Sequence, residues 1–129
     1  MIYQLPKIQT EKPIVEVTDL SFFVREVVRA KVLVLAFFFT EWSGSCRSLN
    51  PLLTEIAADH PALLKVVKVN ADRNPGVAAR YSIHSVPTLV CFSGGEETAR
   101  RIGRDSVQAL LSELTMTTYT LDAHAVARE

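Results

Sequence analysis

The stretch Trp42-Ser43-Gly44-Ser45-Cys46 joins two segments of different character and decides the fold. Before it, residues 33–39 are seven apolar residues in a row, too few to span a bilayer but enough for a fully buried strand. After it, from 47 to 60, apolar residues recur at helical spacing. The serines and Gly44 predict a sharp turn that places Cys46 at a helix N-terminus. Free N–H groups and the helix dipole favour a thiolate there, the usual setting of a reactive cysteine.

The pattern along the chain predicts one domain in which strands and helices alternate. We expect strands over 14–17, 32–39, 64–69, 88–92 and 98–102, and helices over 19–29, 47–60, 76–81 and 106–114. The uninterrupted apolar run at 32–39 is typical of a central strand covered on both faces. The strand–helix–strand order predicts a parallel pair, and Ser93-Gly94-Gly95 predicts a hairpin turn. Pro51 should kink the helix that contains it.

Composition excludes several classes of partner. The chain has 129 residues, with 14 basic and 14 acidic side chains and a formal net charge of zero. No overall field therefore recruits nucleic acid or an anionic membrane. Residues 1–13 lack a basic segment followed by an apolar one, so we expect no secretion signal and a cytoplasmic protein. The run Arg100-Arg101-Ile102-Gly103-Arg104 is interpreted as a solvated edge.

The motif and its context resemble the thioredoxin family, whose signature at this point is Trp-Cys-Gly-Pro-Cys. The other landmarks follow in the family's order: Pro51, the strand at 68–72, the cis-proline loop Val86-Pro87-Thr88, and the hairpin glycines Gly95 and Gly103. The resemblance implies an α/β thioredoxin fold, with a central mixed β-sheet flanked on both faces by helices. It covers roughly 14–114, which leaves an N-terminal arm over 1–13 and a C-terminal tail over 115–129.

The resemblance also implies a chemistry, and it shows what this chain has lost. Ser43 stands at the position of the family's attacking cysteine, and Cys46 stands at that of the resolving cysteine. An alcohol ionises far above a thiol, so Ser43 cannot attack a disulfide and a dithiol cycle is excluded. Phe37 stands where the family usually has a buried aspartate, which makes Lys68 the remnant of a proton relay. We expect Cys46 either to pack as an inert thiol or to exchange slowly.

A substrate surface is also implied by the resemblance. Trp42, Gly44, Val86, Pro87 and Gly103 are predicted to form an apolar groove that holds an extended peptide through backbone pairing. The implied partners are a protein or peptide with a disulfide or an extended segment, and an electron donor of the thioredoxin reductase type. No cofactor and no metal are expected.

Other candidate sites are weak. Cys91 lies four residues beyond Pro87 in a strand, about 13 Å along the chain, whereas a disulfide needs Cα atoms within about 7 Å. We therefore expect Cys91 to be a buried apolar residue. Ser43 with His84 suggests a hydrolase, but the strand–turn–helix elbow of such enzymes is missing. The cysteines and histidines lack metal-ligand spacing.

Two histories account for Ser43. In the first, serine is an introduced replacement in a protein disulfide reductase whose natural motif is Trp-Cys-Gly-Ser-Cys. In the second, the gene encodes serine, and the protein is a redox-silent module that binds peptides or proteins, or a monothiol protein that acts through Cys46. Whether the chain is an enzyme therefore stays open at this point.

Overall fold

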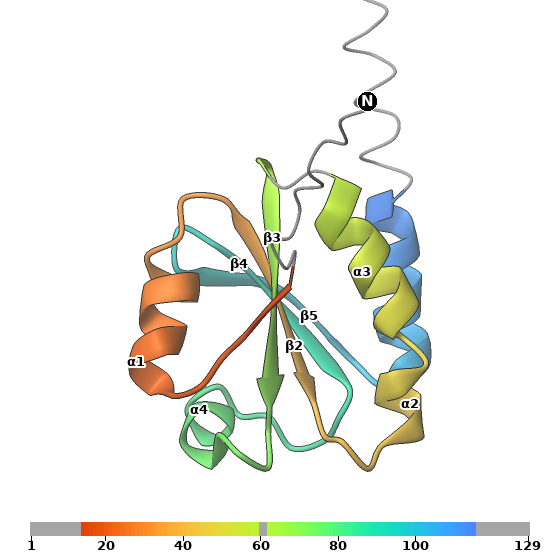
Figure 1. Ribbon diagram of the computed structural model, residues 1–129, viewed down its shortest axis with the longest axis horizontal. Coiled ribbons are helices and arrows are strands. Elements are labelled where there is room, and N and C mark those ends of the chain that lie inside the picture. Colours follow the sequence, from red (N-terminus) through yellow and green to blue (C-terminus); the bar gives the residue numbers. More distant parts are fainter. Residues whose placement is uncertain (1–13, 60–61, 116–129) are drawn as a thin grey trace, which may run out of the picture.

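A computed structural model describes residues 14–59 and 62–115, and its centre is a five-stranded sheet (Figure 1). The strand order is β1-β3-β2-β4-β5. The pairs β1–β3 and β2–β3 are parallel, and the pairs β2–β4 and β4–β5 are antiparallel. The strands are β1 (Ile14–Glu16), β2 (Leu33–Phe39), β3 (Leu64–Asn70), β4 (Thr88–Ser93) and β5 (Glu96–Ile102). The predicted mixed sheet and its parallel pair are confirmed.

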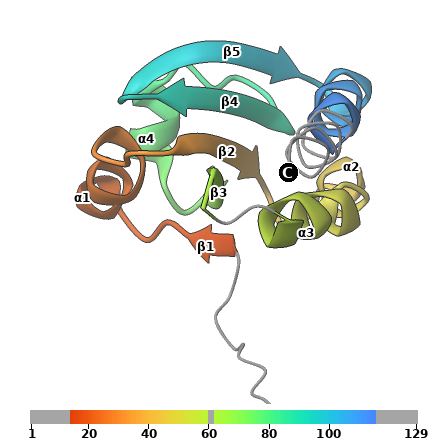
Figure 2. The same cartoon turned by 90° about the horizontal axis from the view of Figure 1, so that it is seen from above.

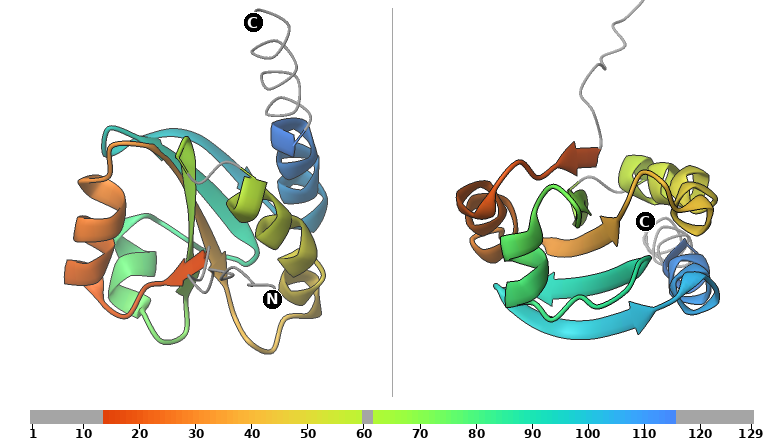
Figure 3. Two further views of the ribbon diagram at one scale, coloured as in Figure 1. Left: turned by 45° about the horizontal axis from the view of Figure 1, so that its top comes forward. Right: turned by 90° about the horizontal axis from the view of Figure 1, so that it is seen from below.

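Helices cover both faces of this sheet (Figure 2). One face carries α1 (Leu20–Phe23), the π-helical turn η2 (Val24–Val28) and α4 (Pro75–Arg80). The other carries α2 (Gly44–Arg47), α3 (Asn50–Asp59) and a helix over 104–115 that lies beside α3 (Figure 3). No helix in the described part of the chain is both long and apolar enough to cross a membrane. The α/β thioredoxin fold expected from the sequence is therefore present.

The central strand β2 contributes to two separate cores because its side chains alternate between the faces. Leu35 and Phe37 join the core beneath α3 and the helix over 104–115. Val34, Ala36 and Phe38 join the core beneath α1 and α4. All five are fully buried, which explains why the sequence of β2 is apolar throughout.

Three helix predictions differ from the structure. The helix expected over 19–29 begins as predicted, with Asp19 Oδ1 accepting a bond from the N–H of Phe22, but it continues as the π-helical η2. The helix expected over 47–60 is two helices, because α2 ends at Arg47 and α3 starts at Asn50. Pro51 is thus in the first turn of α3, where its missing N–H removes no helical bond, and the predicted kink is wrong.

The ends of the domain also differ from expectation. The last helix begins at 104 rather than the predicted 106, and it includes Thr115, so the predicted start of the tail at 115 is wrong. The predicted arm over 1–13 and the tail from 116 onward lie outside the described residues.

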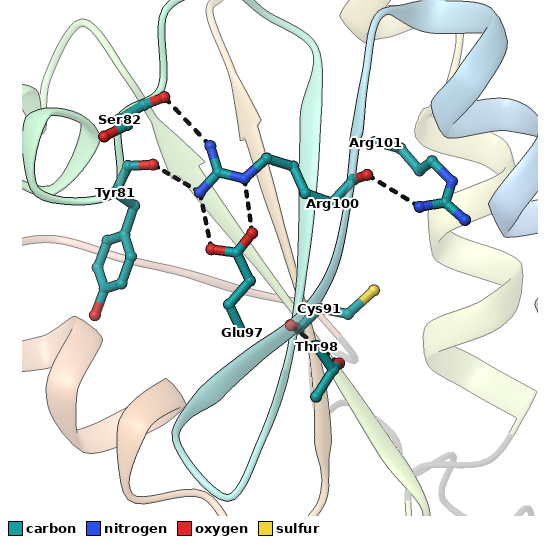
Figure 4. A network of polar contacts seen from close by, with 7 residues as sticks. All are labelled: Tyr81, Ser82, Cys91, Glu97, Thr98, Arg100 and Arg101. Atoms are coloured by element: carbon teal, nitrogen blue, oxygen red, sulfur yellow. Dashed lines mark hydrogen bonds and ion pairs between the residues drawn. The ribbon is translucent and has the colours of Figure 1, made fainter.

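Arg100 is not part of a solvated edge, as the sequence suggested, but ties the β4–β5 hairpin to α4 (Figure 4). Its guanidinium donates to the carbonyls of Tyr81 at 2.7 Å and Ser82 at 3.2 Å. The same group makes a two-point contact with Glu97, at 2.8 and 2.9 Å. The hydrogen bond from Arg100 lowers the pKa of Glu97, against the smaller opposing effect of burial. Arg101 and Arg104 are exposed, as expected for an edge.

We predict that Glu97→Gln lowers the free energy of unfolding at pH 7 by about 0.5–1 kcal/mol, because it removes a partly exposed ion pair. A carboxylate whose pKa is lowered by folding stabilises the protein above its unfolded-state pKa and loses that effect as the folded-state group is protonated. The difference between variant and parent should therefore shrink below about pH 4.3, the ordinary pKa of a glutamate. Urea unfolding from pH 7 to pH 3 measures it. The neighbouring Glu96→Gln is the control, since Glu96 has no ion pair among the described residues, and an equal loss in both variants would contradict the prediction.

Candidate functional site

Ser43 is a helix cap rather than a free hydroxyl. It immediately precedes α2, with an extended backbone, and its Oγ accepts a hydrogen bond from the N–H of Cys46 at 3.2 Å. The side chain is only 8% exposed. A serine at this position satisfies one of the N–H groups that every helix start leaves open. The Ser43 hydroxyl oxygen is thus occupied by a hydrogen bond from the backbone N–H of Cys46.

Gly44 has a smaller role in the turn than the sequence suggested. The turn falls on Glu41 and Trp42, and Gly44 is the first residue of α2. A Cβ built on Gly44 meets only the end of the Arg47 side chain, at 3.6 Å, which is an ordinary contact. The backbone therefore does not require glycine here.

Cys46 is a buried free thiol, 2% exposed, in the core beneath α3. Its position in α2 matches the sequence prediction, but the surface exposure expected of an attacking thiol is missing. Cys91 is also free and buried, in mid-strand opposite Leu35 of β2. Burial raises the pKa of the Cys91 thiol, so it is a poor nucleophile.

Trp42 is the most exposed large apolar side chain of the described residues, at 71%. Its indole Nε1 donates to Asp72 Oδ2 at 2.9 Å, on the turn that follows β3. One edge of the ring is therefore anchored while the apolar remainder faces solvent. Sequence reasoning placed Asp72 only within a family landmark and missed this contact, which joins residues thirty positions apart.

The loop before β4 presents a free backbone segment. The Val86–Pro87 peptide bond is cis, Val86 is half-buried and Pro87 is buried. Neither the N–H nor the C=O of Val86 has a hydrogen-bond partner among the described residues, whereas the Pro87 carbonyl accepts from the N–H of Gly103 at 2.9 Å. Gly103 has φ +95°, a conformation that disfavours side chains, and open space lies beyond its Cα.

Lys68 has partners other than the carboxylate that the resemblance implies. It faces Phe37 across the parallel pair β2–β3. Its ammonium donates to Asn50 Oδ1 at 3.1 Å and lies 4.5 Å from the centre of the Phe39 ring. Both contacts stabilise a cation without neutralising it. The sequence does not predict Asn50 as a site residue. Its place before Pro51 indicates a helix start, but not its contact with Lys68.

The weaker alternatives receive no support from the structure. Ser43 Oγ is occupied by the helix cap, and no contact joins it to the exposed His84 in the described part of the chain. Within residues 14–59 and 62–115, no three histidine, cysteine or acidic side chains gather as metal ligands do.

We predict that Ser43→Ala lowers the free energy of unfolding by about 1 kcal/mol, the usual effect of losing a side-chain helix cap. Ser45→Ala is the matched control, because Ser45 is exposed and its hydroxyl makes no hydrogen bond among the described residues. Denaturant unfolding of both variants measures the difference. Equal stability of the two variants would show that the Ser43 cap is not formed.

Comparison with known proteins identifies the family. A model of the family described as Thioredoxin matches residues 13–116. The chain is 42% identical over 99 residues to the thioredoxin of Pyropia yezoensis, which covers 77% of this chain and 92% of that protein. It is 46% identical over 88 residues to thioredoxin 1 of Nostoc sp., an alignment that covers 68% of this chain and 81% of that protein. It is 39% identical over 95 residues to the thioredoxin of Rickettsia felis, an alignment that covers 74% of this chain and 90% of that protein. The chain therefore belongs to the thioredoxin family of thiol-disulfide oxidoreductases.

Proposed function

We propose that this chain is a thioredoxin whose parent activity is the reduction of protein disulfides and which, with Ser43 in the attacking position, does not turn over as a dithiol enzyme. The observation that carries the proposal is the position of Ser43 Oγ. It lies between the exposed Trp42 and the buried Cys46, 3.2 Å from the Cys46 nitrogen. A cysteine at position 43 would place its attacking sulfur about one helical turn before Cys46, which stands at the resolving position.

The reaction needs two sulfurs in sequence. The first attacks a substrate disulfide and forms a mixed disulfide, and the second displaces the reduced substrate. An oxygen nucleophile does not perform the first step, and Cys46 is too buried to perform it at a comparable rate. Cys91 is an unsuitable replacement because it is held in the middle of β4 with a raised pKa.

Peptide binding does not depend on the missing sulfur. The free N–H and C=O of Val86 can pair with an extended chain as a neighbouring strand would, and the exposed face of Trp42 offers apolar area. We propose that the groove of Trp42, Val86, Pro87 and Gly103 holds an extended protein segment. A thioredoxin reductase-type donor and a cytoplasmic location belong to the same proposal, supported by two cysteines that are both unpaired.

Restoring the sulfur tests the enzymatic part. We predict that Ser43→Cys reduces a disulfide-linked protein, with dithiothreitol as reductant, at least about tenfold faster than the present chain, because the two-sulfur exchange becomes complete. Ser45→Cys is the matched control: it makes the same exchange of oxygen for sulfur at an exposed neighbouring position. No gain from Ser43→Cys, or an equal gain from both, would reject the proposal.

The rate of the restored protein also separates the two histories of Ser43. If serine is an introduced replacement, the surroundings are those of a working enzyme and the restored rate should approach that of a known thioredoxin. If serine is natural, Phe37 and Ser45 belong to a site no longer maintained for catalysis, and the restored protein should remain slow.

Peptide binding is tested separately. In a Cys46→Ser background, Trp42→Ala should weaken the binding of an extended peptide about tenfold, since an exposed aromatic anchor contributes much of such an interface. Fluorescence anisotropy of a labelled peptide with an alkylated cysteine measures the affinity. Leu63→Ala is the control, because Leu63 is another exposed apolar residue, at 57%, outside the groove. Unchanged binding in the tryptophan variant would remove the groove from the proposal.

A further inference from the structure

A hollow of about 270 Å³ opens beside Cys46 and is separate from the proposed peptide groove. Its polar lining comes from Glu16, Thr40, Glu41, Arg47, Asn50 and Lys68, whereas none of the four groove residues lines it. Sites for drug-sized ligands usually measure about 300–1,000 Å³, so this one suits a molecule smaller than most drugs. The hollow gives Cys46 an approach that does not pass over Ser43.

The hollow contains an unsatisfied donor. Thr40 follows the end of β2 and is 4% exposed, and its Oγ1 is buried with no hydrogen-bond partner among the described residues. A buried hydroxyl without a partner is destabilising by about 1–3 kcal/mol. Such a group in the wall of a polar hollow indicates a ligand that accepts its hydrogen bond.

Lys68 contributes a cation without a counter-ion. Its contacts, the Asn50 amide oxygen and the Phe39 ring, are both uncharged, and it makes no ion pair with any described residue. Of its two register neighbours, Phe37 is apolar, and Glu16 is an exposed residue at the end of the short edge strand β1. A half-buried ammonium beside an unpaired hydroxyl forms the recognition pattern for a small carboxylate.

The other charged side chains around the hollow do not cancel the attraction of Lys68 for a carboxylate. Glu41 is largely exposed and has Arg73 3.9 Å away. Arg47 donates to the carbonyl of Glu41 at 2.8 Å, which leaves most of its N–H groups available. Glu16 is the one acidic neighbour of Lys68 without an ion pair in residues 14–59 and 62–115, and it should oppose an incoming anion moderately.

We propose that the hollow binds the carboxylate of a small disulfide, through Lys68 and Thr40, and so delivers the disulfide to Cys46. This inference rests on the proposed function in the case in which serine is natural and the protein acts as a monothiol through Cys46. The thiolate of Cys46 attacks one sulfur of the bound disulfide, R–S–S–R. The Cys46–S–S–R bond forms, the original S–S bond breaks, and RS⁻ leaves and takes up the proton that Cys46 lost. Lys68 and Thr40 position the disulfide and do not take part in the exchange.

Three small disulfides of similar size and different charge test the inference. These are 3,3′-dithiodipropionate, which carries carboxylates, bis(2-hydroxyethyl) disulfide, which is neutral, and cystamine, which carries ammonium groups. Intact-protein mass spectrometry follows adduct formation at pH 7.5, and each rate is divided by that of a short unstructured peptide with one cysteine. We expect the normalised rate on Cys46 to be about tenfold higher for the carboxylate than for the neutral disulfide, and lowest for cystamine.

Variants of the hollow provide the controls. Lys68→Gln should abolish the preference for the carboxylate, whereas Lys68→Arg should keep it because the charge remains. Thr40→Val removes a hydroxyl without changing shape, so it should not lower stability and should slow only the carboxylate disulfide, about threefold. Glu16→Gln should raise the carboxylate rate. Circular dichroism confirms that each variant is folded.

The outcomes separate this inference from the proposed function. A preference unchanged in Lys68→Gln, an adduct on Cys91 instead of Cys46, or no adduct with any disulfide would overturn the carboxylate site. None of these results bears on peptide binding in the Cys46→Ser background or on the activity restored by Ser43→Cys. Failure of those two tests would in turn leave the selectivity for carboxylates intact.

Discussion

The burial of β2 on both faces is the constraint on which the rest of this structure depends. Its residues pack alternately into the core beneath α3 and the core beneath α1 and α4, so neither layer of helices can be placed without it. The parallel pair with β3 and the antiparallel pair with β4 fix the strand in position along its whole length. The chain leaves this rigid strand at Thr40 and reaches the capping residue Ser43 within three residues, which gives the motif its fixed location.

The fixed location of the motif also sets positions 43 and 46, which hold the two cysteines of the family's signature. Ser43, which caps α2, is 8% exposed, while Cys46, three residues later, is 2% exposed and packs in the core beneath α3. The family's two-step exchange uses two sulfurs in sequence, the first to attack the substrate and the second to displace it. The Ser43 oxygen accepts a hydrogen bond from the Cys46 N–H, so the start of α2 is capped with a hydroxyl at this position.

The sequence predicted much of the fold because its signals were local. Apolar runs, alternating strands and the Gly94-Gly95 turn located all five strands to within two residues. The wrong predictions concern helix geometry and helix ends, which tertiary packing determines. No local residue pattern predicts the π-helical form of η2, the separation of α2 from α3, or the start of the last helix at 104. In the same way, the positions of Ser43 and Cys46 follow from the motif. The contacts of Trp42 with Asp72 and of Lys68 with Asn50 join segments far apart in the sequence, and no local pattern predicts them.

Lys68 shows how one apolar neighbour decides the electrostatic character of a site. A carboxylate in place of Phe37 would face the ammonium across the β2–β3 pair, whereas the aromatic residue leaves the positive charge without a compensating anion. The ring of Phe39, stacked on Phe37 at 6.3 Å, and the Asn50 amide hold the ammonium in position instead. Because a half-buried cation with only neutral partners favours any anion that can reach it, the apolar Phe37 leaves Lys68 available to an external anion. The residues at positions 43 and 37 thus bear on separate properties, the exchange chemistry and the charge beside Lys68, and neither removes the free backbone groups of Val86.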